Sequence, residues 1–202
     1  MKVTLLASTP NPTLVCSVAA STCTNVAPIF KENRNMVERV MDYGHESIAE
    51  HVSFTFVVEG VSLSCTHQLV RHRIASYSQK SGRAVEGLPQ FVFDFPLMPL
   101  SADRMEKWHI ETGELYEQLL SEGVPQEEAR KVWPVGSATN IVITKNARSL
   151  RHLFRERLCK RAQPEIFNMA MKMFTLAVQA APSLFNGDFP DCKNCTERSC
   201  KF

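Results

Sequence analysis

The sequence has no apolar run approaching the roughly 20 residues that a membrane-spanning helix needs, so we expect no such helix. It also lacks a large excess of one charge, because 23 lysine and arginine residues face 21 aspartate and glutamate residues. A net charge of +2 excludes a strongly basic protein that coats nucleic acid without specificity. No internal repeat or low-complexity tract is present, and no Gly-x-Gly-x-x-Gly motif follows a predicted strand, so a Rossmann flavoenzyme is unsupported.

The N-terminus resembles a secretory signal only faintly. The apolar stretch that begins at residue 3 is too short, and two prolines between residues 8 and 13 interrupt it. Seven cysteines form an odd set, and four of them are scattered through patterned segments, as is typical of reduced thiols. We therefore expect an opening strand and a cytoplasmic protein.

Apolar periodicity predicts strands and helices in irregular order. Alternation over residues 52–58 is typical of a half-buried strand that ends at Gly60, and Ser62 is placed to cap a helix running to about Arg73. Further strands are expected at residues 3–7 and 141–144, with a short one at 91–93. Further helices are expected at residues 35–43, 101–122 (capped by Ser101), from Pro125 onward, 148–158 and 164–181, with a loop at 75–90.

This order predicts the α+β class: a single domain over residues 1–190, with a mostly antiparallel central sheet flanked by helices. We expect residues 191–202 to form a separate cysteine-rich tail, because three of the seven cysteines lie in the last eleven residues. Cys192, Cys195 and Cys200 could hold zinc or an iron–sulfur cluster if a fourth ligand comes from elsewhere. The alternative is a mobile tail whose thiols are free or paired in disulfides.

Residues 71–83 carry three arginines, a histidine and several serines, at a predicted helix end and in the loop after it. Arginine presents a planar fork of donors that grips phosphate oxygens in pairs. Ser81 and the N–H groups around Gly82 would complete an anion site, because glycine lets the chain approach a ligand closely. Gln68 lies one turn before Arg71 and shares its face. The alternative is a solvated basic helix end whose cations complement the helix dipole.

Six positions of this segment resemble the signature of the flavin-dependent thymidylate synthases. That signature is Arg-His-Arg, two residues, Ser, four residues, Ser, one residue, Arg. It is matched here by Arg71, His72, Arg73, Ser76, Ser81 and Arg83. Many members have Asn-Glu where this chain has Ser78-Gln79.

Two flanking blocks extend the resemblance over about residues 43–170. The segment of residues 43–51 is similar to the Gly-His-Glu segment of the family; its two histidines are six apart, on different helical faces, so we expect no metal there. Downstream, Arg157 lies seven residues after Leu150 and four after Leu153, which points it along an apolar stripe. A buried ion pair, or a bound pyrimidine or phosphate, would explain such an arginine. The downstream block is matched by Asn146, Arg148, Arg157, Gln163, Glu165 and Ile166, with Arg130 before it and His152 where other members carry asparagine.

The resemblance implies reductive methylation of dUMP by FAD, with NADPH as reductant and methylenetetrahydrofolate as one-carbon donor. It also implies a homotetramer with FAD sites between subunits, no metal, and no nucleic-acid or membrane partner. Arg157 would be catalytic, polarising the uracil ring. FAD would be held by Ser47, Glu50, Arg71, His72, Arg73, Gln79, Asn146, Arg148 and His152. The substrate dUMP would be held by Gln68, Arg71, Gln79, Lys80, Ser81, Gly82, Arg83, Arg130 and Arg157.

A nucleic-acid-binding module is the main alternative function, with residues 71–83 and 145–161 as phosphate contacts. The near-neutral net charge and the scarcity of aromatic residues in the first segment count against it. Strong, salt-sensitive binding to RNA or DNA by a colourless protein would favour it.

Overall fold

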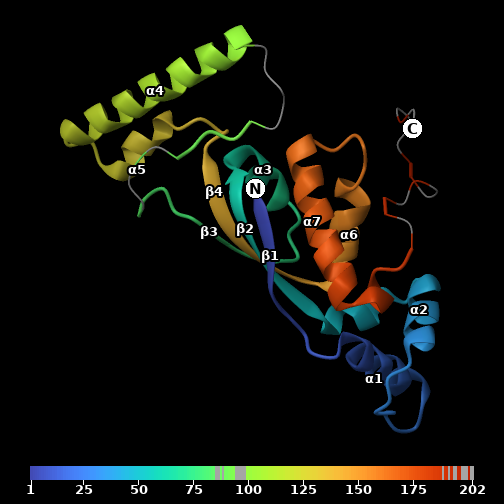
Figure 1. Ribbon diagram of the computed structural model, residues 1–202. Coiled ribbons are helices and arrows are strands. Elements are labelled where there is room, and N and C mark those ends of the chain that lie inside the picture. Colours follow the sequence, from blue (N-terminus) through green and yellow to red (C-terminus); the bar gives the residue numbers. More distant parts are fainter. Residues whose placement is uncertain are drawn as a thin grey trace. The chain divides into compact units, whose positions relative to one another are not determined.

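The computed structural model describes residues 1–84, 87, 89–93, 99–187, 189–190, 192, 195–196 and 200. Four strands form one antiparallel sheet in the order β1-β2-β4-β3 (Figure 1). The strands are β1 (Lys2–Ser8), β2 (Ser53–Ser62), β3 (Ser76–Gln79) and β4 (Ala138–Asn146). The antiparallel sheet and the irregular order of strands and helices confirm the predicted α+β class.

The chain divides into two compact units. The first unit comprises residues 1–2, 58–71 and 77–142, and the second comprises residues 3–57, 72–76 and 143–202. The helices of the first unit are α3 (Leu63–Leu69), α4 (Pro99–Ser121), α5 (Gln126–Ala129) and the 3-10 turn η2 (Arg130–Val132). Those of the second unit are α1 (Pro12–Thr24), α2 (Arg34–Asp42), η1 (Glu46–His51), α6 (Ala147–Arg157), α7 (Pro164–Ala180) and η3 (Pro182–Leu184).

The predicted strand over residues 52–58 and the predicted start of a helix at Ser62 are confirmed. The points at which this strand and this helix end differ from the prediction. The alternating residues Phe54, Phe56 and Val58 are fully buried, and the Ser62 hydroxyl accepts the Cys65 N–H that opens α3. The strand does not stop at Gly60, which takes a φ of +66° inside β2. The helix stops at Leu69 rather than near Arg73.

Three other expectations were wrong, and one helix was not predicted. Residues 75–90 contain β3, a four-residue strand whose polar sequence carries no apolar alternation, so pairing with β4 decides its conformation. Ser101 lies inside α4, which already begins at Pro99. Helix α1 was not predicted, because its small and hydroxyl-bearing residues give little apolar periodicity. The expected strand at residues 91–93 is reduced to one bridge, between Phe91 and Ser137.

An aromatic cluster fixes α6 in the second unit. The Phe154 ring lies 5.2 Å from the ring of Phe174 and 5.7 Å from that of Phe185, both in edge-on geometry. Helices α6 and α7 pack side by side (Figure 1). Their buried faces also carry Leu150, Leu153, Met169 and Met173. This packing holds one face of α6 rigidly, so the polar residues at its two ends have defined positions.

In the part of the chain that the structure describes, no helix is both long enough and apolar enough to cross a membrane.

Candidate active site

The turn that carries His72 is held from two elements of the second unit. His72 is buried, and its Nε2 accepts a hydrogen bond of 3.0 Å from Nε of Arg157, the last residue of α6. The ammonium group of Lys145, near the end of β4, donates to the backbone oxygens of His72 and Ile74 at 3.1 and 3.0 Å. The predicted inward direction of Arg157 is therefore only half realised: the side chain is half-buried and its partner is an imidazole.

Burial sets the charge state of this turn. Desolvation, reinforced by the Arg157 cation, lowers the pKa of His72 to about 4, so the imidazole is neutral near pH 7. Burial likewise lowers the pKa of Lys145 to about 8. Sequence reasoning missed Lys145, although Ile141, Ile143 and Lys145 occupy alternate positions of β4 and are all buried. The alternation alone would have placed its ammonium group inside the protein.

A carboxylate of α6 lies beside the same histidine. Glu156 Oε2 is 3.8 Å from His72 Nε2, and Glu156 Oε1 is 3.2 Å from His152 Nε2. The two imidazole rings meet edge to face with centroids 5.9 Å apart. The structure thus brings His72, His152 and Arg157 together, and adds Glu156, which the sequence analysis did not single out.

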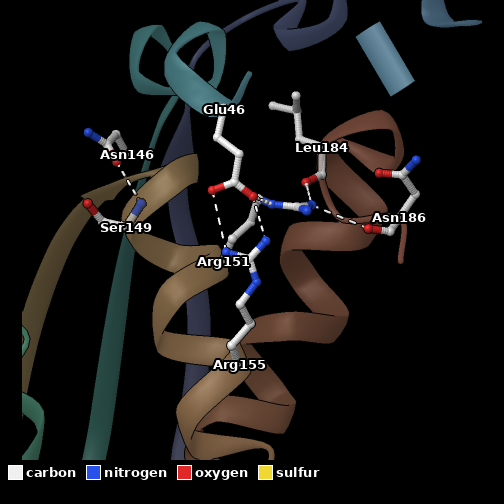
Figure 2. Close-up of polar contacts among 7 residues, drawn as sticks. All are labelled: Glu46, Asn146, Ser149, Arg151, Arg155, Leu184 and Asn186. Carbon is white, nitrogen blue, oxygen red and sulfur yellow. Dashed lines mark hydrogen bonds and ion pairs between the residues drawn. The ribbon is translucent and has the colours of Figure 1, made fainter. Parts of the chain in front are cut away.

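Three further predicted cofactor residues of the second unit lie near the N-terminal end of α6, namely Glu50, Asn146 and Arg148. Glu50, in η1, forms an ion pair with Arg148, and that pair raises the pKa of the arginine. Asn146 caps α6 by accepting the Ser149 N–H at 2.8 Å, and its amide nitrogen points away from the helix (Figure 2). Ser47 is exposed in η1. Arg73 is also exposed.

The most buried arginine of α6 is Arg151, which the sequence analysis did not consider. Its Nε donates to Glu46 Oε1 at 3.0 Å, and its Nη1 donates to the backbone oxygens of Leu184 and Asn186 at 2.6 and 3.3 Å (Figure 2). Arg155 donates to the same carboxylate at 2.5 Å. Burial alone would raise the pKa of Glu46, but the hydrogen bonds from Arg155 and Arg151 outweigh it and lower that pKa. Arg151 lies four residues after buried Ala147, so the periodicity argument applied to Arg157 would have found it.

In the first unit, the predicted phosphate loop closes around Gly82. A Cβ at this position would lie 2.7 Å from the Trp133 ring and 3.2 Å from Cδ of Arg130. A larger residue here would have to displace the Trp133 ring or the Arg130 side chain. Ser81 Oγ accepts the Arg83 N–H at 3.2 Å, and the Arg83 guanidinium holds the Glu127 carboxylate at 2.8 Å. Of the predicted phosphate-binding residues, Ser81, Gly82, Arg83 and Arg130 thus lie in one region.

The remaining predicted residues of the first unit are more dispersed. The Gln79 amide nitrogen reaches Thr66 Oγ1 at 3.2 Å and, more weakly, Thr139 Oγ1 at 3.5 Å. Gln68 is half-buried in α3, and its backbone oxygen accepts the Arg71 N–H at 3.3 Å. The side chains of Arg71 and Lys80 are exposed.

Comparison with known proteins decides the family. Residues 4–183 match the family described as thymidylate synthase complementing protein. This chain belongs to that family. The resemblance noted in the sequence is thereby confirmed, and the matched range spans both units and every residue predicted for the site.

Three proteins that are similar to this chain are each named flavin-dependent thymidylate synthase. The relative from Clostridium tetani is 40% identical over 222 residues, covering 96% of this chain and 89% of its own length. That from Geobacter sulfurreducens is 38% identical over 209 residues, covering 95% and 88%. That from Pyrococcus furiosus is 48% identical over 142 residues, covering 67% and 58%.

Proposed function

We propose that this protein is a flavin-dependent thymidylate synthase. It reductively methylates dUMP to dTMP, with methylenetetrahydrofolate as one-carbon donor and NADPH-reduced FAD as hydride source. The observation that carries the proposal is the half-buried Arg157, 3.0 Å from a neutral His72, in a chain of the thymidylate synthase complementing family. Relatives that match nearly the whole chain bear the name of this activity.

Arg157 is the residue to which we assign catalysis. Carbon 5 of uracil is a poor nucleophile until negative charge builds in the ring, and a guanidinium beside O4 and N3 stabilises that charge. His72 accepts the Arg157 Nε–H while remaining uncharged, so it orients the guanidinium without cancelling its charge. A preorganised donor of this kind supplies about 3 kcal/mol of transition-state stabilisation.

The second unit offers a donor set that fits a flavin nucleotide. The exposed guanidinium groups of Arg73 and Arg148 suit a pyrophosphate, while the outward amide nitrogen of Asn146 and the Glu50 carboxylate suit ring and ribityl polar groups. FAD, when bound, supplies the hydride that completes the methyl group. We assign its binding to Ser47, Glu50, Arg71, His72, Arg73, Gln79, Asn146, Arg148 and His152.

The loop around Gly82 is suited to the dUMP phosphate. Arg83 already holds one anionic group, the Glu127 carboxylate, at 2.8 Å, so its guanidinium is oriented to bind oxyanions. Because Gly82 has no side chain, Cδ of Arg130 approaches the loop closely. We infer that the Arg130 guanidinium serves as a second group for the phosphate. We assign dUMP binding to Gln68, Arg71, Gln79, Lys80, Ser81, Gly82, Arg83, Arg130 and Arg157.

We further propose that the protein is a cytoplasmic homotetramer with FAD sites between subunits. Residues 1–190 form the synthase domain and residues 191–202 the cysteine-rich tail. A shared site of this kind explains how a chain of 202 residues binds FAD, dUMP and folate together.

The test is an absorbance spectrum of the purified protein with FAD, followed by anaerobic NADPH, dUMP and methylenetetrahydrofolate. We expect flavin bands that NADPH bleaches, and dTMP that forms only when both dUMP and the folate are present. Flavin binding without dTMP would reject the synthase while retaining a flavoprotein. A protein that binds no flavin would reject the proposal altogether.

A further inference from the structure

Three potential metal ligands of the second unit converge on one point. They are Nε2 of His72, Nε2 of His152 and a carboxylate oxygen of Glu156, and these atoms all lie within 4.8 Å of one another. We propose that they form a binding site for a divalent transition-metal ion of the zinc class, and that the metal competes with Arg157 for His72. The site goes beyond the proposed synthase activity, which uses no metal.

Two of the three ligands are preorganised by helix geometry. His152 and Glu156 are four residues apart on α6, so their side chains lie on one face, and they are already 3.2 Å apart. The third ligand comes from the buried turn, where His72 Nε2 is 3.8 Å from the other carboxylate oxygen. Donor atoms bound to one zinc ion at about 2.0–2.2 Å lie roughly 3.5 Å apart, so small side-chain rotations would complete the set.

The chemistry of the donor set favours zinc over magnesium or calcium. Two imidazole nitrogens and one carboxylate oxygen match a three-ligand zinc site that leaves a fourth position to water. Calcium and magnesium prefer sites made of oxygen ligands. His152 and Glu156 are both substantially exposed, so an ion can reach the site from solvent.

Metal binding at His72 and the hydrogen bond from Arg157 to His72 are mutually exclusive. The lone pair of His72 Nε2 now accepts the Arg157 Nε–H, and a metal would need the same lone pair. The groups whose charge acts on His72 are Arg157, Glu156, Lys145 and His152, so besides its own ligands the metal would meet the cations of Arg157 and Lys145. Removing the Arg157 charge should therefore tighten metal binding, whereas removing Glu156 should weaken it.

The experiment measures zinc affinity of the flavin-free full-length protein by competition with a chromophoric chelator. Cys192, Cys195 and Cys200 are replaced by serine throughout, to remove the thiols of the tail. In this background Glu156→Gln and His152→Gln should each weaken zinc binding at least about tenfold, the scale of loss seen when a metal site is perturbed. Arg157→Ala should tighten it severalfold. His67→Gln, which removes an exposed histidine of the first unit, should leave it unchanged.

Cobalt(II) identifies the ligands independently. Bound at this site, it should show no sulfur-to-metal charge-transfer band, because the donors are nitrogen and oxygen. Zinc affinity that is the same in Glu156→Gln and His152→Gln as in their parent would overturn the proposal, as would a thiolate band with cobalt. Neither readout depends on flavin or on dTMP formation, so failure here is distinct from failure of the proposed function.

Discussion

Replacing Glu46 by glutamine tests the ion-pair cluster that joins η1 to α6. The substitution keeps the shape of the side chain and removes the charge that Arg151 and Arg155 share. Arg151 is only 6% exposed, so its guanidinium would lose its counter-ion in a place that water barely reaches. Arg155 is about one-third exposed and can turn toward solvent.

The structure sets the size of the effect. Removing one partner of a buried ion pair costs about 3–5 kcal/mol, because the other charge stays buried. The low end of this energy range applies here for two reasons. Arg151 keeps its hydrogen bonds to the backbone oxygens of Leu184 and Asn186. The guanidinium of Arg155 can turn into water. We expect a loss of about 3 kcal/mol, which lowers the melting temperature of a chain of this size by roughly 6–12 °C.

The assay is thermal unfolding followed by circular dichroism at pH 7 and again in acid. The pKa of Glu46 is lowered in the folded protein, so its contribution is present above the unfolded value of 4.5 and is lost as the pH falls through the folded pKa. The difference between the protein and Glu46→Gln should therefore shrink in acid. Glu38→Gln is the control, because its exposed pair with Arg34 on α2 contributes only about 0.3–0.5 kcal/mol. The reasoning is refuted if Glu46→Gln is no less stable than Glu38→Gln, or if its deficit persists unchanged in acid.

Three further predictions concern the site. Arg157→Ala should keep FAD but lose about 10²–10³-fold in kcat, the range for loss of one preorganised donor; full turnover would remove its ring-polarising role. Arg83→Ala should weaken dUMP binding about 10–100-fold in titration calorimetry, since hydrogen bonds to charged groups contribute about 1.5–3 kcal/mol; an unchanged Kd would refute the phosphate assignment. Because the pKa of His72 falls from 6.5 to about 4 on folding, only the unfolded chain binds its proton between these values. Lowering the pH from 6.5 to 4 should therefore reduce the free energy of unfolding by up to about 3 kcal/mol more than in His72→Gln, measured by urea titration.

Local signals were enough to predict much of the fold. Alternation in β2 predicted the buried Phe54 and Phe56, and the hydroxyl of Ser62 predicted the start of α3. Strand β3 was missed because a short polar strand is stabilised by its neighbour in the sheet, which no local pattern records. Helix α1 was also missed, because its residues form no strong apolar stripe.

The motif was enough to select the residues of the candidate site, but the contacts that these residues make could be predicted only in part. Spacing alone predicted that Ser81, Gly82 and Arg83 act together, and the structure adds a second reason for the glycine, because Trp133 and Arg130 occupy the space that a side chain would need. The partner of Arg157 could not be predicted from local sequence, because His72 lies 85 residues away. Which buried cation pairs with which anion depends on three-dimensional packing, and so the pairing of Arg151 with Glu46 had to be found in the structure.

The close approach of Trp133 to Gly82 also gives the protein an optical reporter. The chain has only two tryptophans, and the second, Trp108, lies on α4. Indole emission shifts in wavelength and intensity with nearby charge, and the Trp133 ring touches the loop to which we assign the dUMP phosphate. In a Trp108→Phe variant, the emission of Trp133 alone would follow nucleotide binding in real time. Occupancy of the loop could then be timed separately from any colour change of the flavin.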